Sequence, residues 1–185
     1  MKKLLLNIAL ILVVGLTQAS AQKYFTKTGN VSFFSSTPVE NIEAHNNKAT
    51  SVIDAATGNM EFAVLIKAFE FEKALMQEHF NENYMESSKF PKATYKGQIV
   101  NNNAVNYTKD GVYKVKTKGQ LTMHGVTKDV ETDGVIEVKN GKITGTSTFN
   151  VNPQDYNIEI PKLVRDKIAK EIKIEVKSAY QPMAK

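Results

Sequence analysis

The side chains that could carry chemistry are few, and they are scattered along the sequence. Three histidines, His45, His79 and His124, lack the spacing of metal ligands, and the chain has no cysteine. The missing cysteine excludes thiol catalysis and thiolate metal sites. The serines lack a nucleophile-elbow motif, and the acidic residues fall in predicted turns or on predicted surfaces. We therefore predict no catalytic residue, no metal site and no cofactor.

Two of these side chains have more than one interpretation. His124 precedes Gly125 at the end of a predicted strand. Its ring could form a structural hydrogen bond that holds the turn, or it could contact the head group of a ligand. Arg165 is the only arginine. Its guanidinium could hold a phosphate by two hydrogen bonds, but a surface ion pair is the simpler interpretation.

The N-terminus has the pattern of an export signal. Lys2 and Lys3 precede an apolar run over residues 4–16, and Ala19-Ser20-Ala21 supplies small residues at a cleavage position. The run is shorter than the roughly 20 apolar residues that a spanning helix needs. We expect a signal peptide over residues 1–21 and a periplasmic or secreted protein without a stable membrane anchor.

The remaining chain, residues 22–185, has the length of one domain with a sizeable core. The formal net charge of the whole chain is +5, and its lysines are spread along the sequence instead of clustering. A nucleic-acid partner would need a concentrated basic face with aromatic stacking groups, so we exclude one. Without cysteines, stability must come from burial of the core.

Alternation of apolar and polar residues is the dominant pattern after Gln22. Within 112–122, Tyr113 and Leu121 belong to one face and a row of lysines to the other, as in a strand with one buried face. The segment 71–88 instead has helical spacing and precedes Pro91. The predicted strands cover 30–36, 43–54, 60–68, 93–99, 112–122, 127–138, 142–150 and 171–177.

This order of elements fits either a two-sheet sandwich or a closed barrel. Eight long strands favour the barrel, because closure at that number leaves room for side chains or one elongated ligand. Gly97, Gly119 and Gly145 lie in phase with the apolar faces, where they allow bending or leave interior room. We predict an all-β fold, an eight-stranded antiparallel barrel with a short helical insertion between strands 3 and 4.

The octapeptide LTMHGVTK at 121–128 resembles a signature of the YceI-like family, bacterial envelope proteins described as polyisoprenoid-binding and lipocalin-like. The segments 29–33 and 90–95 are similar to that family's opening strand and to the strand entry after its helix. The resemblance implies a lipocalin-like barrel with an elongated apolar cavity. It also implies a long isoprenoid ligand, such as a polyprenyl phosphate or a quinone.

Candidate ligand-binding residues come from inward strand faces, from the helical insertion, which could cap one barrel mouth, and from the turn at His124. For the strand residues the alternative is plain core packing, and for the insertion it is a helix that seals the core. The strand set is Phe33, Phe62, Ile66, Tyr95, Tyr113, Leu121, Phe149 and Ile174, and the insertion set is Phe71, Leu75, Phe80, Met85 and Phe90.

The sequence thus favours an extracytoplasmic lipid-binding protein that holds an isoprenoid or similar amphiphile and is not an enzyme. One alternative is an enzyme acting on such a lipid, which an acid beside His124 would favour. The other is a packed barrel that serves as an envelope interaction module, which an interior space well under about 300 Å³ would favour. The sequence leaves a homodimer and the identity of the lipid open.

Overall fold

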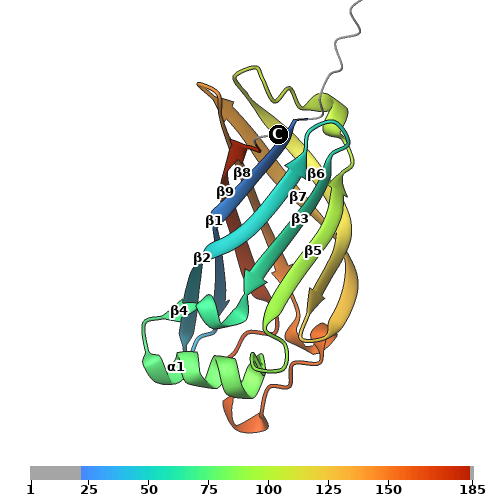
Figure 1. The fold of residues 1–185 in the computed structure, drawn as a ribbon. Coiled ribbons are helices and arrows are strands. Elements are labelled where there is room, and N and C mark those ends of the chain that lie inside the picture. The colour runs from blue at the N-terminus through green and yellow to red at the C-terminus, as the bar shows by residue number, and fades with distance from the viewer. Residues whose placement is uncertain (1–21, 184–185) are drawn as a thin grey trace, which may run out of the picture.

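The computed structural model describes residues 22–183, so the predicted signal peptide lies outside the described residues. Eight long strands form one antiparallel sheet that closes into a barrel (Figure 1). A ninth strand, β4 (Glu70–Phe71), pairs only with β2. The long strands are β1 (Lys23–Ser36), β2 (Asn41–Asp54), β3 (Asn59–Leu65), β5 (Lys92–Ile99), β6 (Gly111–Met123), β7 (Val126–Lys139), β8 (Lys142–Val151) and β9 (Ile172–Pro182).

Closure comes from the first strand, which pairs on both of its sides. The hydrogen-bonded order is β1-β9-β8-β7-β6-β5-β3-β2, and β2 pairs with β1 again. Phe33 of β1 lies opposite Ala44 of β2 and Ile174 of β9. All of these pairs are antiparallel, so the prediction of an all-β, eight-stranded antiparallel barrel is confirmed.

The helical insertion lies between β3 and β5, as predicted. It contains a 3₁₀ turn (Ile66–Ala68), β4, the helix α1 (Ala74–His79) and one π-helical turn (Phe80–Tyr84). The prediction that strand 60–68 includes Ile66 is wrong, because β3 stops pairing with β5 at Leu65. The partner strand begins only after Pro91, which has no N–H to extend the ladder. Among residues 22–183, no helix is both long and apolar enough to cross a membrane.

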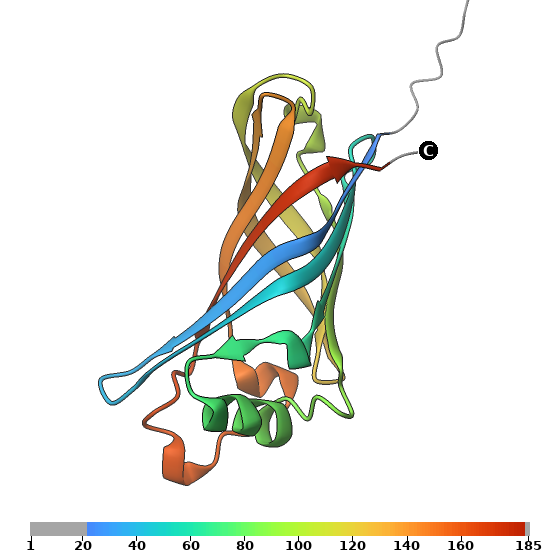
Figure 2. The same cartoon turned by 60° about the vertical axis from the view of Figure 1, so that its left-hand side comes forward.

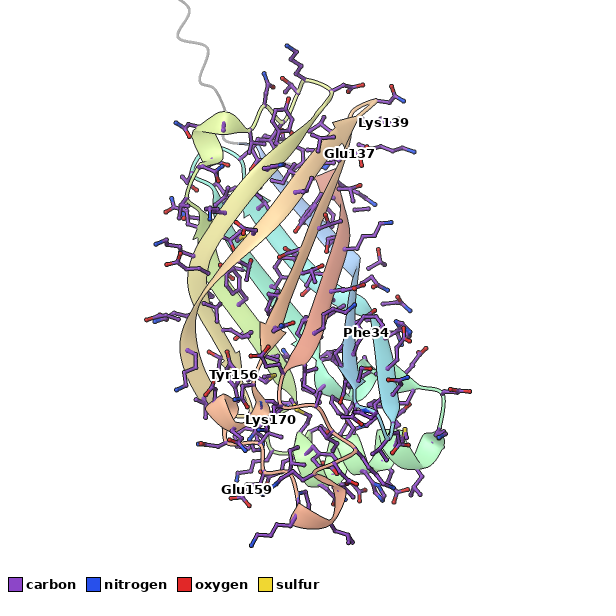
Figure 3. All side chains as sticks on the ribbon, turned by 180° about the vertical axis from the view of Figure 1, so that it is seen from behind. Phe34, Glu137, Lys139, Tyr156, Glu159 and Lys170 are labelled. Carbon is purple, nitrogen blue, oxygen red and sulfur yellow. The ribbon has the colours of Figure 1, made fainter. Side chains whose placement is uncertain are left out.

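The two ends of the barrel differ. Figure 2 shows α1 and the segment between β8 and β9 gathered at one end, which we call the helical end. Figure 3 places Tyr156, Glu159 and Lys170 at this end, and Glu137 and Lys139 at the opposite one. We call the opposite end the closed end. Its interior is filled by the buried residues Tyr24, Ile53, Ile99, Val115, Ile136, Val138, Ile143 and Tyr180.

Tyrosines seal the closed end. The rings of Tyr24 and Tyr107 stack with centroids 5.7 Å apart, and the Tyr107 hydroxyl donates to Asn102 Oδ1 at 2.7 Å. The Tyr180 hydroxyl lies 2.9 Å from Ser51 Oγ. Burial raises the pKa of Tyr180 to about 12, so this hydroxyl keeps its proton near neutral pH. The closed end is therefore an apolar plug in which the Tyr107 and Tyr180 hydroxyls are hydrogen-bonded.

A pair of glycines shapes the wall between the two ends. Gly97 of β5 lies directly opposite Gly119 of β6, and the Tyr95 hydroxyl lies over both. A Cβ at Gly119 would come closer than 3.0 Å to the Lys96 carbonyl oxygen, to Gly97 Cα and to the Tyr95 hydroxyl. These two positions therefore need glycine, because any side chain would push the Tyr95 ring and the strands apart.

We expect Gly119→Ala to lower the free energy of unfolding by about 1–3 kcal/mol, the usual cost of overpacking a tight site. Urea unfolding followed by circular dichroism measures it. Gly145→Ala is the matched control, since a Cβ there meets only the edge of the Tyr180 ring at 3.2 Å. Equal stability of the two variants would contradict a specific need for glycine at Gly119.

Candidate functional site

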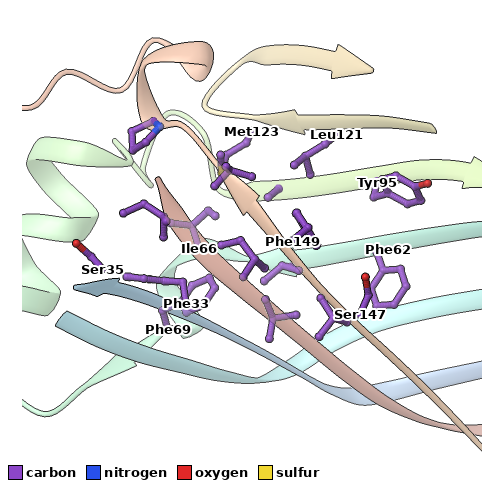
Figure 4. Close-up of a pocket in the computed structure, with 18 of the residues that line it drawn as sticks. Phe33, Ser35, Phe62, Ile66, Phe69, Tyr95, Leu121, Met123, Ser147 and Phe149 are labelled. Atoms are coloured by element: carbon purple, nitrogen blue, oxygen red, sulfur yellow. The ribbon is translucent and has the colours of Figure 1, made fainter. Parts of the chain in front are cut away.

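A cavity of about 620 Å³ lies inside the barrel, between the closed end and the helical end. All eight long strands contribute side chains to its wall, most of them apolar. Figure 4 shows Phe33, Ile66 and Phe149 from three different parts of the chain around it. The cavity is the inner face of the sheet, and period-two alternation brings the apolar side chains to it.

Eleven of the fourteen candidate residues line this cavity, and their contact with a ligand remains a prediction. They come from both the strands and the insertion: Phe33, Phe62, Ile66, Phe71, Leu75, Phe80, Met85, Tyr95, Leu121, Phe149 and Ile174. Three others, Phe90, Tyr113 and His124, do not line it.

Tyr113 points inward as its alternation requires, but it lies beyond the cavity. It packs against the buried residues of the closed end, and its hydroxyl donates to the Lys109 carbonyl at 2.9 Å. The structure places Tyr113 in the packing of the closed end, and its contact with a ligand stays a prediction. Alternation predicts which face of a strand a side chain occupies, but it does not predict where along the barrel axis that side chain lies.

Aromatic rings attach the helical insertion to the barrel. Phe80 stacks on Phe33 of β1 with ring centroids 5.3 Å apart, and it contacts Phe71 and Phe69 at 5.1 and 5.6 Å. Ring pairs at such distances stabilise packing beyond the area that they bury. The cluster forms the cavity wall next to α1. Phe69, which the sequence analysis did not select, belongs to it and is buried.

His124 connects three segments at the helical end. Its Nδ1 lies 3.0 Å from the Tyr156 carbonyl oxygen and its Nε2 lies 2.9 Å from Glu86 Oε2. The histidine side chain is only 9% exposed, and its ring packs on Phe90 at a centroid distance of 4.6 Å. Both neighbouring oxygens are acceptors, so a ring that donates from both nitrogens satisfies both.

The backbone conformation of the turn explains why Gly125 follows His124. His124 and Gly125 both have positive φ, 51° and 76°, and they form the two-residue link between β6 and β7. Such a hairpin turn favours glycine, and a Cβ at Gly125 would also come within 3.0 Å of the Phe90 ring. His124 thus acts as a structural anchor, although the structure does place the acid Glu86 beside it. Neither residue of this pair lines the cavity.

The polar groups of the cavity wall fall into two sets. Acidic, basic and imidazole side chains of the wall lie toward the helical end, where Glu40, Lys73, His79 and Lys167 line the cavity. Deeper in the wall, Thr117 Oγ1 lies 3.0 Å from Thr132 Oγ1. Such hydroxyls, bonded within the wall, do not penalise an apolar guest. The arrangement is an apolar chamber with a charged rim at one end.

The comparison with known proteins gives the chain its family. Residues 19–180 match the YceI-like domain. The chain belongs to the YceI-like family. The octapeptide at 121–128 therefore lies in a domain of the family that it resembles. None of the curated proteins matches this sequence.

Three solved structures share the fold of this YceI-like chain. A polyisoprenoid binding domain from Saccharophagus degradans, implicated in plant cell wall breakdown, has 13% identity and a TM-score of 0.76, covering 87% of this chain and 98% of its own. BcnA of Burkholderia cenocepacia has 16% identity and a TM-score of 0.69, covering 83% and 96%. The Campylobacter jejuni YCEI protein has 18% identity and a TM-score of 0.57, covering 77% and 85%. Identities this low support the fold alone.

Sequence reasoning missed the segment between β8 and β9 of this YceI-like barrel. It contributes Ile158, Ile160, Val164 and Ile168 to the cavity wall. A signal was present, since Ile158 and Ile160 alternate with Asn157 and Glu159 like a short strand. The segment forms two 3₁₀ turns, Pro153–Tyr156 and Lys162–Val164, and loop, so its contribution depends on how it folds across the opening.

We expect His124→Ala to lower the free energy of unfolding by about 1–3 kcal/mol, because it leaves the Tyr156 carbonyl and Glu86 without their partner. Chemical denaturation measures the loss. His79→Ala is the control, since His79 is exposed. If both variants unfold alike, His124 does not anchor the turn.

Proposed function

We propose that this YceI-like protein is an extracytoplasmic lipid-binding protein that holds a long isoprenoid, such as a polyprenyl phosphate or a quinone, or a similar amphiphile. The observation that carries the proposal is the apolar cavity of about 620 Å³. Cavities of roughly 300–1,000 Å³ are typical of small-molecule sites. The solved Saccharophagus degradans relative, described as a polyisoprenoid binding domain, supports the same ligand class.

The chemistry of the wall fits a tail with no hydrogen-bonding groups. Such a tail gains about 25 cal/mol for each Å² of apolar surface that leaves water. The closed end is packed by its own core, and the charged side chains lie at the helical end. We therefore expect the tail to point toward the closed end and the head group to stay near Glu40, Lys73 and Lys167.

The two alternatives have less support. A packed barrel would leave far less interior space than the 620 Å³ found here. The acid that lies beside His124, which would favour an enzyme, is Glu86, but this pair lies outside the cavity wall. Within residues 22–183, no group of three or more His, Cys, Asp or Glu side chains could hold a metal ion. Export is supported by the sequence pattern of residues 1–21 alone.

Native mass spectrometry of protein exported by cells that express the full chain tests the proposal. The mass of the protein shows whether residues 1–21 have been removed, and lipid extraction identifies any molecule that copurifies. We expect a bound long-chain lipid, or binding of added polyprenyl phosphates or quinones. Repeated preparations that neither carry nor bind such lipids would refute the proposal.

A pair of variants on β6 tests where the lipid binds. Leu121 faces the cavity, and Val112 on the same strand is 68% exposed. We expect Leu121→Trp to occupy part of the cavity and lower lipid affinity about tenfold or more, which corresponds to a loss of about 1.4 kcal/mol. Val112→Trp is expected to bind like the parent. Melting temperatures of both variants check that the barrel still folds.

A further inference from the structure

We propose that the helical end of the barrel docks onto a lipid bilayer that carries anionic head groups, with Leu163 inserted among those head groups. The proposal rests on the proposed function, because the docking surface surrounds the end of the cavity through which a membrane lipid would enter. It adds a partner, the membrane surface, and assigns it to specific exposed residues.

The helical end exposes aliphatic side chains from three separate segments. Leu163 in the 3₁₀ turn Lys162–Val164 is 89% exposed, Leu75 in α1 is 61% exposed, and Val39 in the β1–β2 turn is 58% exposed. In Figure 2 the green α1 and the orange turn lie beyond the strands at the helical end, and the blue β1–β2 turn projects sideways at the same end. Exposed aliphatic side chains that gather at one end mark an interaction surface.

The exposed aliphatic residues of the helical end lie next to the wall of the cavity. Leu75 is exposed and also lines the cavity, and Val164, next to Leu163, lines it as well. Apolar side chains therefore lie between the outer surface and the chamber, beside the charged side chains of the rim. A lipid tail that moved along these apolar side chains from a bilayer would stay in contact with apolar groups, and it would avoid the cost of exposing its full length to water.

Positive charge surrounds the most exposed of these side chains. Lys162, Arg165 and Lys167 flank Leu163, and Asp166 is the only acid in that turn. In the described part of the chain, no carboxylate lies within 4.0 Å of any of these three cations. Aliphatic side chains beside free cations are typical of segments that bind at the interface of anionic membranes.

The surface fits a bilayer better than a protein partner. Its aliphatic residues come from three separate segments and have charged side chains, such as Lys73 and Glu40, between them. A stable protein interface needs a contiguous, shape-complementary patch. A fluid head-group layer adapts to separate protrusions. Acids also lie at the helical end, with Glu72, Glu78 and Glu82 in and around α1 and Glu40 in the β1–β2 turn. Residues 159–171 carry four cations, Lys162, Arg165, Lys167 and Lys170, against Glu159, Asp166 and Glu171, so the attraction to anionic lipid comes from the turn around Leu163 alone.

Vesicle co-sedimentation tests the docking. The exported protein is mixed with vesicles of phosphatidylcholine alone, or of equal parts phosphatidylcholine and phosphatidylglycerol. We expect stronger retention on the mixed vesicles, weakened by added salt. Leu163→Asn should reduce retention about tenfold, since burying one leucine side chain contributes roughly that factor or more. Val112→Asn is the control, because Val112 is comparably exposed but lies outside the helical end.

A second measurement separates the docking from the proposed function. Binding of a lipid added from solvent, without vesicles, is measured for the parent and for Leu163→Asn, and should be equal. Lipid binding without vesicle retention, or equal retention of both proteins, overturns the docking and leaves the proposed function intact. Vesicle retention without any lipid binding overturns the proposed function alone. A dimer that Leu163→Asn converts to a monomer would assign the surface to a second copy and overturn the docking.

Discussion

β1 pairs with β2 along one edge and with β9 along the other, and the rest of the structure depends on this double pairing. It leaves no free edge among the long strands. Because the closed sheet has no second sheet or helical layer inside it, every inward side chain points toward the opposite wall of the same barrel. With eight strands, the interior is just wide enough for side chains or one ligand. Whether such a barrel is solid or hollow then depends on where the sequence places its bulky residues.

The bulk is placed unevenly along the barrel axis. At the closed end, Tyr24, Tyr180 and β-branched residues meet at the centre and fill it. In the middle, the glycine pair Gly97 and Gly119 lets the Tyr95 ring lie along the wall. At the helical end, Phe80 from the insertion packs on Phe33. The cavity therefore follows from where the bulky residues lie along the barrel and is not a general looseness of the core.

Alternation in the sequence was enough to predict the strands, the position of the insertion and the inward face of many residues that line the cavity. It failed where the outcome depends on partners distant in the chain. Ile66 continues the pattern of β3 but lies outside the strand, because β5 begins only after Pro91. The contact of His124 with Glu86 spans 38 residues and needs positive φ at both positions, which no local pattern specifies. The wall segment between β8 and β9 is mostly irregular, and its one alternating stretch, Ile158 and Ile160, is too short to indicate an element.

Folding leaves part of the core near the helical end incompletely buried. Some core residues therefore stabilise the fold, whereas others keep apolar surface that a ligand can cover. Eight buried residues form the core of the closed end, whereas Leu121, Phe149 and Ile174 pack around a second core cluster while only partly buried. Their remaining exposed surface faces the cavity. The free energy of burying that surface is not gained in folding, so it is available to a ligand that fills the chamber. A ligand that binds only the folded barrel must also stabilise it, which links the occupancy of the cavity to the stability of the fold.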